Sequence, residues 1–419
     1  MLTPELVTQV FLAALAAATT LQLWLSARQI RHIRTHRDAV PEAFADRITL
    51  AAHQRAADYS IARTRLGQIE SLYEAALLLL WTLGGGLQWL IGFWQDFGLS
   101  DTATGVGVLV SATLIISLLD LPFSIWQTFV IEECFGFNRT RVSTFIADLL
   151  KQGLILLLLA TPLTWLILWL MASSGSLWWL YVWGVWMGFT LLMIWAYPTF
   201  IAPLFNQFKP LADEALRQRI EALLARCGFT SRGIFVMDGS RRSGHGNAYF
   251  TGLGRNKRIV FFDTLLDSLE PDEVEAVLAH ELGHFKRRHV QKRLVSMALM
   301  SLAGLALLGW LIEEPAFYQG LGVSEPSLYA GLMLFLLISP VFGVFLTPVM
   351  SWLSRKHEYE ADAFAAQQAG ATDLIRALVK LYRENASTLT PDPLYSAFHD
   401  SHPPAPLRVA HLRRLEAGG

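Results

Sequence analysis

Residues 271–293, PDEVEAVLAHELGHFKRRHVQKR, organise the rest of the sequence, and they predict a single helix. Pro271 suits the first helical position, where its missing N–H leaves no hydrogen bond unmade. Asp272 and Glu273 follow it and favour the positive end of the helix dipole, while basic residues gather toward the other end. The helix therefore has a defined start and direction.

This helix contains the motif HELGH (280–284). His280 and His284 are four residues apart and lie on one face, so their imidazoles can reach one tetrahedral zinc ion. Glu281 lies beside the first histidine and could accept a proton from a water molecule that the metal acidifies. The alternative is an amphipathic surface helix with incidental histidines.

A catalytic zinc site needs a third protein ligand. The segment SRKHEYEADAFAAQ (354–367) predicts a helix with Glu358 and Asp362 four residues apart on one side. Glu358 is our candidate ligand, and Asp362 could then accept a hydrogen bond from a liganding imidazole and fix its tautomer. The alternative is a helix on which these acids form ion pairs with Arg355 and Lys356.

Other residues compete for the third position. His357 and Glu360 lie in the same segment as Glu358. His289 is a poor ligand because, five residues after His284, it faces another side of the helix. We expect His289 to be solvated.

The composition indicates a membrane protein. Of the 419 residues, 53% are hydrophobic and 16% are charged, whereas soluble domains carry charge on about a quarter of their residues. The formal net charge of −1 provides no basic field for nucleic acid, so nucleic-acid binding is not expected. Two distant cysteines cannot form a thiolate cluster, so any metal must be held by His and carboxylates.

Apolar stretches predict about seven transmembrane helices, each near the 20 residues that a bilayer requires. They lie at about 5–26, 73–94, 104–120, 153–171, 177–196, 294–312 and 329–350. We divide the chain into a membrane domain (1–200), a catalytic region with the HELGH helix (201–293), two further spans (294–350) and a tail with the third ligand (351–419). The predicted fold is an α-helical polytopic membrane protein with a gluzincin-like zinc protease region and a small β-element.

The connecting segments alternate in charge. Segments 95–103, 172–176 and 313–327 contain no Lys or Arg, whereas 28–65 and 197–293 are rich in them. Because basic loops stay on the cytoplasmic side, we expect the N-terminus outside, and the zinc site and C-terminus in the cytosol. The Ala-, Leu- and Arg-rich composition favours a bacterial cytoplasmic membrane.

Two apolar runs before the HELGH helix, NAYFTGLG (247–254) and RIVFFD (258–263), have strand-like composition. An exposed edge there could hold an extended peptide by strand addition, with Asn247 and Ala248 as candidate contacts. The alternative is an ordinary hairpin packed on the helix. His245, in the preceding loop, could also approach a substrate.

The chain resembles the type 1 CAAX prenyl proteases, which are membrane zinc endopeptidases, and their bacterial relatives. The matching motifs are EECFGFNRT (132–140), NAYFTG (247–252), RIVFFDTLL (258–266), HELGH (280–284), EYEADAFA (358–365) and SHPPAPLR (401–408). The resemblance implies one zinc ion on His280, His284 and Glu358, with Glu281 as the general base. It further implies that Asp362 contacts a zinc ligand without binding the metal itself. It also implies that His402 and Arg408 stabilise the oxyanion, and that the helices enclose a chamber.

These observations predict a zinc metalloendopeptidase that acts on peptide or protein substrates, including lipidated ones, within membrane lipids. The sequence HPPAPLR (402–408) departs from the Leu- and Glu-rich helix start that we expect before the arginine. This departure concerns the oxyanion role that the resemblance implies for Arg408. A rival hypothesis is an inactive polytopic binding or transport protein with a structural zinc site. That protein would need a fourth protein ligand and would give Glu281 no role. The sequence does not define an oligomeric state.

Overall fold

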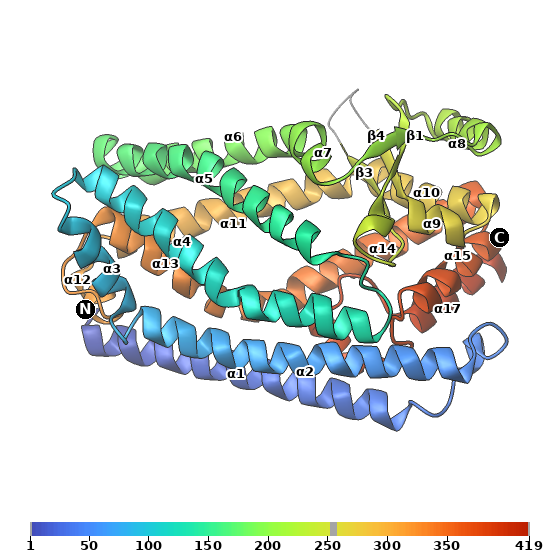
Figure 1. Ribbon diagram of the computed structural model, residues 1–419, viewed down its shortest axis with the longest axis horizontal. Helices are drawn as coiled ribbons and strands as arrows, with labels where there is room; N and C mark the ends of the chain where they lie inside the picture. The colour runs from blue at the N-terminus through green and yellow to red at the C-terminus, as the bar shows by residue number, and fades with distance from the viewer. Residues whose placement is uncertain (1, 252–257, 418–419) are drawn as a thin grey trace.

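The computed structural model describes residues 2–251 and 258–417 and is mainly helical, with one small sheet (Figure 1). The long helices run roughly along the longest axis of the molecule. The N-terminus lies at one end with the short helices α3 and α12, and the sheet, α8, α9, α10, α15, α17 and the C-terminus gather at the other.

The membrane helices largely follow the predicted spans. Within the described residues, six helical segments are long and apolar enough to cross a membrane, or seven if one bent pair counts as a span. The helices are α1 (Pro4–Thr35), α2 (Leu50–Trp81), α3 (Gly86–Gln95), α4 (Asp101–Trp126), α5 (Val142–Ser173), α6 (Trp178–Ala196), α11 (His289–Leu311), α13 (Leu328–Gly343) and α14 (Thr347–Ala369). Wide helical turns extend α4 to Glu132 and α6 to Ile201, and α14 continues α13.

The outer surface of these helices suits a hydrocarbon environment. On α5, Leu150, Leu154 and Leu158 follow at four-residue intervals and are 69%, 58% and 64% exposed. Soluble proteins rarely expose contiguous apolar stripes of this kind. Apolar lipid tails match this face.

The second predicted span, 73–94, is not one straight helix. Helix α2 ends at Trp81, and α3 begins at Gly86 after a turn that bends the path by 47°. Gly85 adopts a positive φ of 77°, which favours glycine, and a Cβ on Gly84 would fall 2.8 Å from the carbonyl oxygen of Leu80. The glycines therefore break the span that the hydropathy predicted as continuous.

Helices α1 and α2 also extend beyond the apolar stretches. Most of segment 28–65, which we expected to be a loop, is helical, because α1 continues to Thr35 and α2 begins at Leu50. Arg37 donates two 2.8 Å hydrogen bonds to the carboxylate of Asp58. Both helices thus continue, with polar residues, past the apolar stretches and toward the end of the molecule that carries the sheet.

The predicted β-element is a four-stranded sheet of order β1-β2-β4-β3, in which only β2 and β4 are parallel. The strands are β1 (Phe208–Pro210), β2 (Ile234–Met237), β3 (Ala248–Thr251) and β4 (Arg258–Phe262). The remaining helices are α7 (Ala202–Phe205), α8 (Glu214–Cys227), α9 (Asp263–Ser268), α10 (Pro271–Lys286), α12 (Pro315–Gln319), α15 (Ala371–Glu384), α16 (Pro393–His399) and α17 (Ala405–Ala417).

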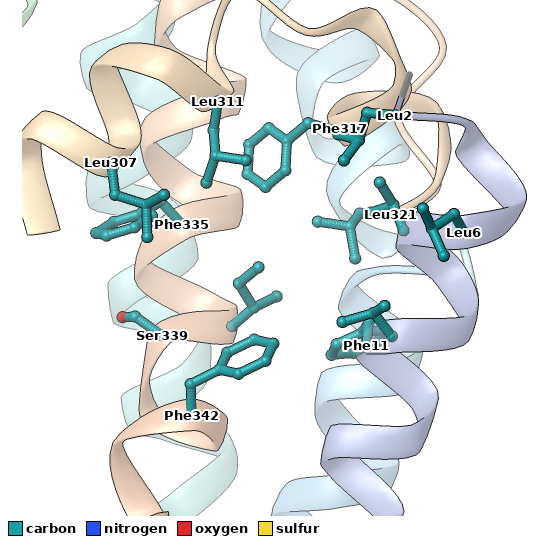
Figure 2. A pocket seen from close by; sticks show the side chains of 13 residues that line it. Leu2, Leu6, Phe11, Leu307, Leu311, Phe317, Leu321, Phe335, Ser339 and Phe342 are labelled. Carbon is teal, nitrogen blue, oxygen red and sulfur yellow. The ribbon is translucent and has the colours of Figure 1, made fainter. Parts of the chain in front are cut away.

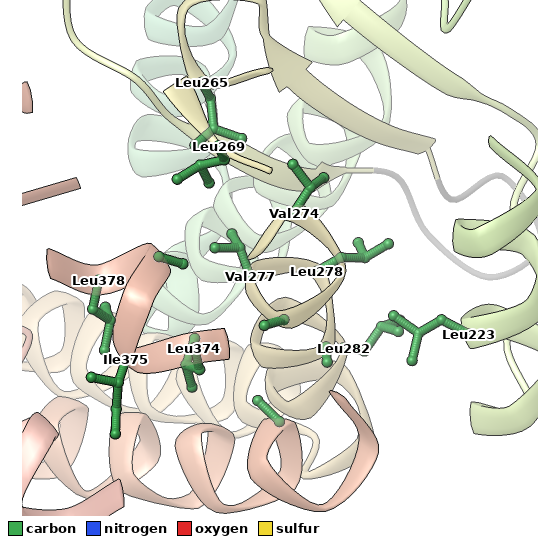
Figure 3. Packing of buried hydrophobic residues seen from close by; sticks show 14 of the residues in the cluster. Leu223, Leu265, Leu269, Val274, Val277, Leu278, Leu282, Leu374, Ile375 and Leu378 are labelled. Atoms are coloured by element: carbon green, nitrogen blue, oxygen red, sulfur yellow. The ribbon is translucent and has the colours of Figure 1, made fainter. Parts of the chain in front are cut away.

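Helix α10, which carries the HELGH motif, is packed on several sides. Its Leu278 and Leu282 point toward Leu223 of α8, while Leu374 and Ile375 of α15 lie on another side (Figure 3). All five side chains are buried. Each such burial contributes about 1.5–3 kcal/mol, so the histidines of the motif project from a firmly fixed helix.

The opposite end of the molecule contains an apolar cavity of about 340 Å³ between α1, α11 and α13 (Figure 2). Phe11, Leu311 and Phe342 line it, and Ser339 supplies the one polar side chain among its lining residues. Among the described residues, no ionisable side chain lines this cavity.

Candidate metal centre

Helix α10 begins where the sequence predicted. Pro271 occupies its first turn, and the backbone N–H of Glu270 donates to the side chain of Glu273 at 2.8 Å in a capping box. The predicted single helix over 271–293 is wrong at its other end, because Arg288 adopts a left-handed conformation with φ of 57°. Helix α11 starts at the next residue, and the chain changes direction there.

The two histidines of the motif face each other. His280 Nε2 and His284 Nε2 are 3.3 Å apart, and His280 is buried. Between them in the chain, Gly283 packs directly against α14, where a Cβ on Gly283 would lie 2.9 Å from the Cα of Ala361. This close approach brings α14, with Glu358, alongside the histidines.

Glu358 completes a set of three potential ligands. Its Oε2 lies 3.3 Å from His280 Nε2, and its Oε1 lies 3.3 Å from His284 Nε2. A zinc ion with ligand bonds of 2.0–2.2 Å separates adjacent tetrahedral ligands by about 3.4 Å. The three side chains are therefore spaced as one zinc ion requires.

The environment of Glu358 also suits a cation. The residue is 4% exposed, and its buried Oε2 accepts no hydrogen bond in the described part of the chain. A buried carboxylate is costly unless it is paired or coordinates a metal. Among the described residues, the group of His, Cys, Asp and Glu side chains placed to hold a metal is His280, His284 and Glu358.

Asp362 lies directly behind His280. Its Oδ1 is 2.9 Å from His280 Nδ1, and the residue is fully buried. Burial lowers the pKa of His280, but its contacts with Asp362 and Glu358 outweigh this effect and raise the pKa to about 9. In the predicted outer position, Asp362 would hold Nδ1 protonated and leave Nε2 for the metal.

Arg408, on α17, is bound to Asp362. Its Nε donates to Asp362 Oδ2 at 2.9 Å, its Nη2 donates to Oδ1, and the residue is 6% exposed. Its Nη1 is 3.8 Å from Glu358 Oε2. The resemblance implied contact with an oxyanion, but this geometry supports a role in anchoring Asp362 beneath His280.

Glu281 is half-buried beside the histidines. Burial raises the pKa of its carboxyl above the usual value, and the nearby His280 and His284 oppose this rise. A carboxylate of raised pKa is a stronger proton acceptor, which is what a general base near neutral pH requires.

His402 approaches the same centre from the segment before α17. Its Nε2 lies 3.4 Å from Glu358 Oε1, while 60% of its side chain is exposed. Its Nδ1 is 2.9 Å from the hydroxyl of Ser401. The ring is thus held beside the ligand set and remains accessible.

The expectation that His289 is solvated is wrong. His289 is 2% exposed, and its Nδ1 lies 3.0 Å from His284 Nδ1. Its Nε2 is 3.0 Å from Glu360 Oε2, and the ring of His357 stacks on it at 4.1 Å. The left-handed turn at Arg288 folds the next residue back toward α10, so His289 supports His284 from behind, and Glu360 contacts His289 in turn.

Strand β3 forms an edge of the sheet and pairs antiparallel with β4. Ala248 belongs to β3, and the exposed Asn247 precedes it and accepts a 2.9 Å backbone hydrogen bond from Phe262. Helix α10 contacts β3. The structure thus contains both an edge strand and its packing on the helix, and peptide binding at this edge stays a prediction. Gly252, which ends the NAYFTG motif, and the rest of the run to 254 lie outside the described residues.

The motif EECFGFNRT, to which the sequence assigned no role, holds the loop before β3. The ring of His245 stacks on Phe137 at 4.3 Å, and its Nε2 is 3.3 Å from Glu132 Oε2. Gly244 donates a 2.9 Å hydrogen bond to the carbonyl of Phe137. His245 therefore contacts the membrane domain and fixes the start of the edge strand.

Comparison with known proteins agrees with this architecture over most of the chain. Residues 29–207 match the family model for the CAAX prenyl protease N-terminal region with five membrane helices, and residues 210–416 match peptidase family M48. The CAAX prenyl protease 1 homolog of Oryza sativa subsp. japonica is 34% identical over 94% of this chain and 95% of its own length. The Homo sapiens homolog is 30% identical over 97% of this chain and 96% of its own length.

A solved structure gives the same result. The crystal structure of S. mikatae Ste24p superposes with a TM-score of 0.91 at 31% identity, covering 97% of this chain and 99% of that protein. These matches confirm the resemblance that the motifs indicated. The chain belongs to the CAAX prenyl protease family within peptidase family M48 and is a multi-pass membrane metalloendopeptidase.

Proposed function

We propose that this metalloendopeptidase binds one zinc ion per chain on His280, His284 and Glu358 and cleaves substrates near a CAAX-type carboxyl end. The observation that supports it best is that His280 Nε2 and His284 Nε2 are 3.3 Å apart and that each lies 3.3 Å from one of the two carboxylate oxygens of Glu358. A His, His, carboxylate set with an open position is the arrangement of catalytic zinc sites.

The roles of the surrounding residues follow from their positions. Zinc bound there would lower the pKa of a water molecule toward 7 and polarise the substrate carbonyl. Glu281 accepts the proton of the attacking water and returns it to the departing amide nitrogen. His402, accessible beside the ligand set, donates a hydrogen bond to the oxygen on which negative charge develops. Asp362 and Arg408 keep His280 in position.

The substrate is proposed from the relatives, which are named CAAX prenyl proteases. A CAAX end consists of a prenylated cysteine, two aliphatic residues and a final residue. Purified protein is incubated with such a peptide in farnesylated and unmodified forms, and mass spectrometry locates the cleaved bond. The proposal predicts faster cleavage of the farnesylated peptide, on the carboxyl side of its cysteine. Equal rates, or cleavage elsewhere, would assign the enzyme to other membrane-associated substrates.

The proposed orientation places the metal centre in the bacterial cytosol and the N-terminus outside. Its support is the basic character of the segments at the end of the molecule that carries the sheet. Cys134 is exposed, whereas Cys227 is buried. A membrane-impermeant maleimide should label Cys134 in inverted vesicles and not in intact cells, and Cys134→Ser supplies the background. Labelling in intact cells instead would reverse the orientation.

A further inference from the structure

A polar cavity of about 610 Å³ adjoins the metal centre. It lies between helices α1 and α2 and the segment 382–404, and His402 forms part of its wall. Hydroxyl, amide and charged side chains line most of it, although α1 and α2 contribute to the membrane domain. Polar cavities among membrane helices hold water or a polar ligand.

One arginine, Arg63 on α2, lines this cavity and interacts with the hydroxyl of Tyr59. The guanidinium of Arg63 on α2 lies 5.5 Å from the ring centre of Tyr59, whose hydroxyl donates to Glu132 at 2.6 Å. Within the described residues, no carboxylate lies within 4.0 Å of the Arg63 guanidinium. Arginine pairs with a carboxylate through two parallel hydrogen bonds when one is available.

Two acids also line the cavity and could compete for Arg63. Glu70 is seven residues further along α2, which is about 10 Å along a helix axis. The Asp400 carboxyl interacts with other residues, Ser396 and Arg355. Neither acid therefore replaces an incoming carboxylate as the partner of Arg63.

The edge strand begins beside this cavity. Asn385, which lines the cavity, accepts a 3.0 Å hydrogen bond from the backbone N–H of Gly246 and donates one of 3.3 Å to its carbonyl. Gly246 lies two residues before β3. A peptide added antiparallel to the free edge of β3 runs against the strand. Its carboxyl end then lies at the start of β3 and points toward the cavity.

We propose that Arg63 binds the free C-terminal carboxylate of the substrate in this cavity. The inference rests on the proposed peptidase function and adds a specificity residue to it. Arg63 would select chains that end shortly after the scissile bond, because an internal segment has no carboxylate to offer. The ligand is thus an α-carboxylate at the end of an extended peptide.

The test uses full-length, zinc-loaded protein and two peptides of identical sequence, one with a free C-terminal carboxylate and one with a C-terminal amide. The fluorophore and quencher are carried on side chains so that the carboxyl end stays free. Wild type should cleave the free acid with a kcat/KM about ten- to hundredfold above the amide, mainly through KM. Arg63→Gln should remove this preference by slowing cleavage of the acid alone.

Two further variants sharpen the comparison. Arg65→Gln changes an exposed arginine on the same helix and should keep the wild-type preference. Arg63→Lys keeps the positive charge but lacks the two parallel donors of a guanidinium, so it should keep part of the preference for the free acid. A wild-type preference near one, or equal slowing of both peptides by Arg63→Gln, would overturn the role of Arg63. If wild type cleaved neither peptide, the proposed function itself would fail.

Discussion

Gly283 of α10 lies so close to Ala361 of α14 that a Cβ on Gly283 would fall 2.9 Å from the Ala361 Cα and 3.1 Å from its carbonyl oxygen. The contact is between two helix backbones, which cannot move apart locally. It sets the distance between the histidines of α10 and Glu358 of α14.

Gly283→Ala should therefore separate the two helices and weaken zinc binding. Overpacking of this kind costs roughly 1–3 kcal/mol of unfolding free energy. We expect a lower thermal midpoint and a lower zinc content after dialysis against a weak chelator. Gly188→Ala, on α6 with no atom within 4 Å of the added Cβ, serves as the control. Full zinc retention by Gly283→Ala would show that this contact does not set the ligand geometry.

Arg408→Gln separates the two roles considered for this arginine. If Arg408 anchors Asp362, its loss removes one of the two partners of this buried carboxylate and leaves only His280, at a cost of up to about 3–5 kcal/mol. Zinc affinity should then fall together with stability, whereas Arg413→Gln, on the exposed side of α17, should change neither. Unchanged zinc affinity with a reduced kcat would instead assign Arg408 to the oxyanion.

His289→Gln should lower zinc affinity without touching a ligand. His289 is 3.0 Å from the outer nitrogen of His284, and outer partners of this kind contribute about 10–100-fold to metal affinity. Glu360→Gln should cause a smaller loss, because it acts through His289. Chelator competition measures both, with the exposed His36→Gln as reference. If His289→Gln bound zinc with wild-type affinity, the contact between His289 and His284 would contribute to packing only.

Zinc uptake should release a proton at neutral pH. In the metal-free protein, burial lowers the pKa of His280, but Asp362 and Glu358 raise it to about 9, so the ring is protonated at pH 7. Zinc must displace that proton, and its affinity should rise about tenfold per pH unit between pH 6 and 8. Asp362→Asn removes one cause of the raised pKa and should flatten this slope. Equal slopes in the two proteins would contradict the assignment.

Much of the fold follows from the sequence, because span length and loop charge depend on composition alone. The break between Trp81 and Gly86 was missed since a hydropathy window ignores backbone conformation. The turn at Arg288 was missed because arginine seldom adopts a positive φ, and no residue type signalled it. That turn also accounts for the error on His289.

The candidate site was predicted in part. The four-residue spacing placed His280 and His284 together, but spacing alone could not choose Glu358 over His357 or Glu360. That choice depends on how α14 packs against Gly283, which is a tertiary contact. Arg63 was counted only as a charge that indicates membrane orientation, because its cavity is formed by segments more than 300 residues apart.

The most direct test of the account compares wild type with Glu281→Gln, measuring bound zinc and cleavage of a quenched fluorescent CAAX peptide in both. Glu281 is proposed to move the proton and not to hold the metal. The account predicts one zinc per chain in both proteins and loss of about 2–4 orders of magnitude in kcat for Glu281→Gln. Equal cleavage by both proteins, or zinc in both with no cleavage by either, would contradict it and favour a structural zinc site.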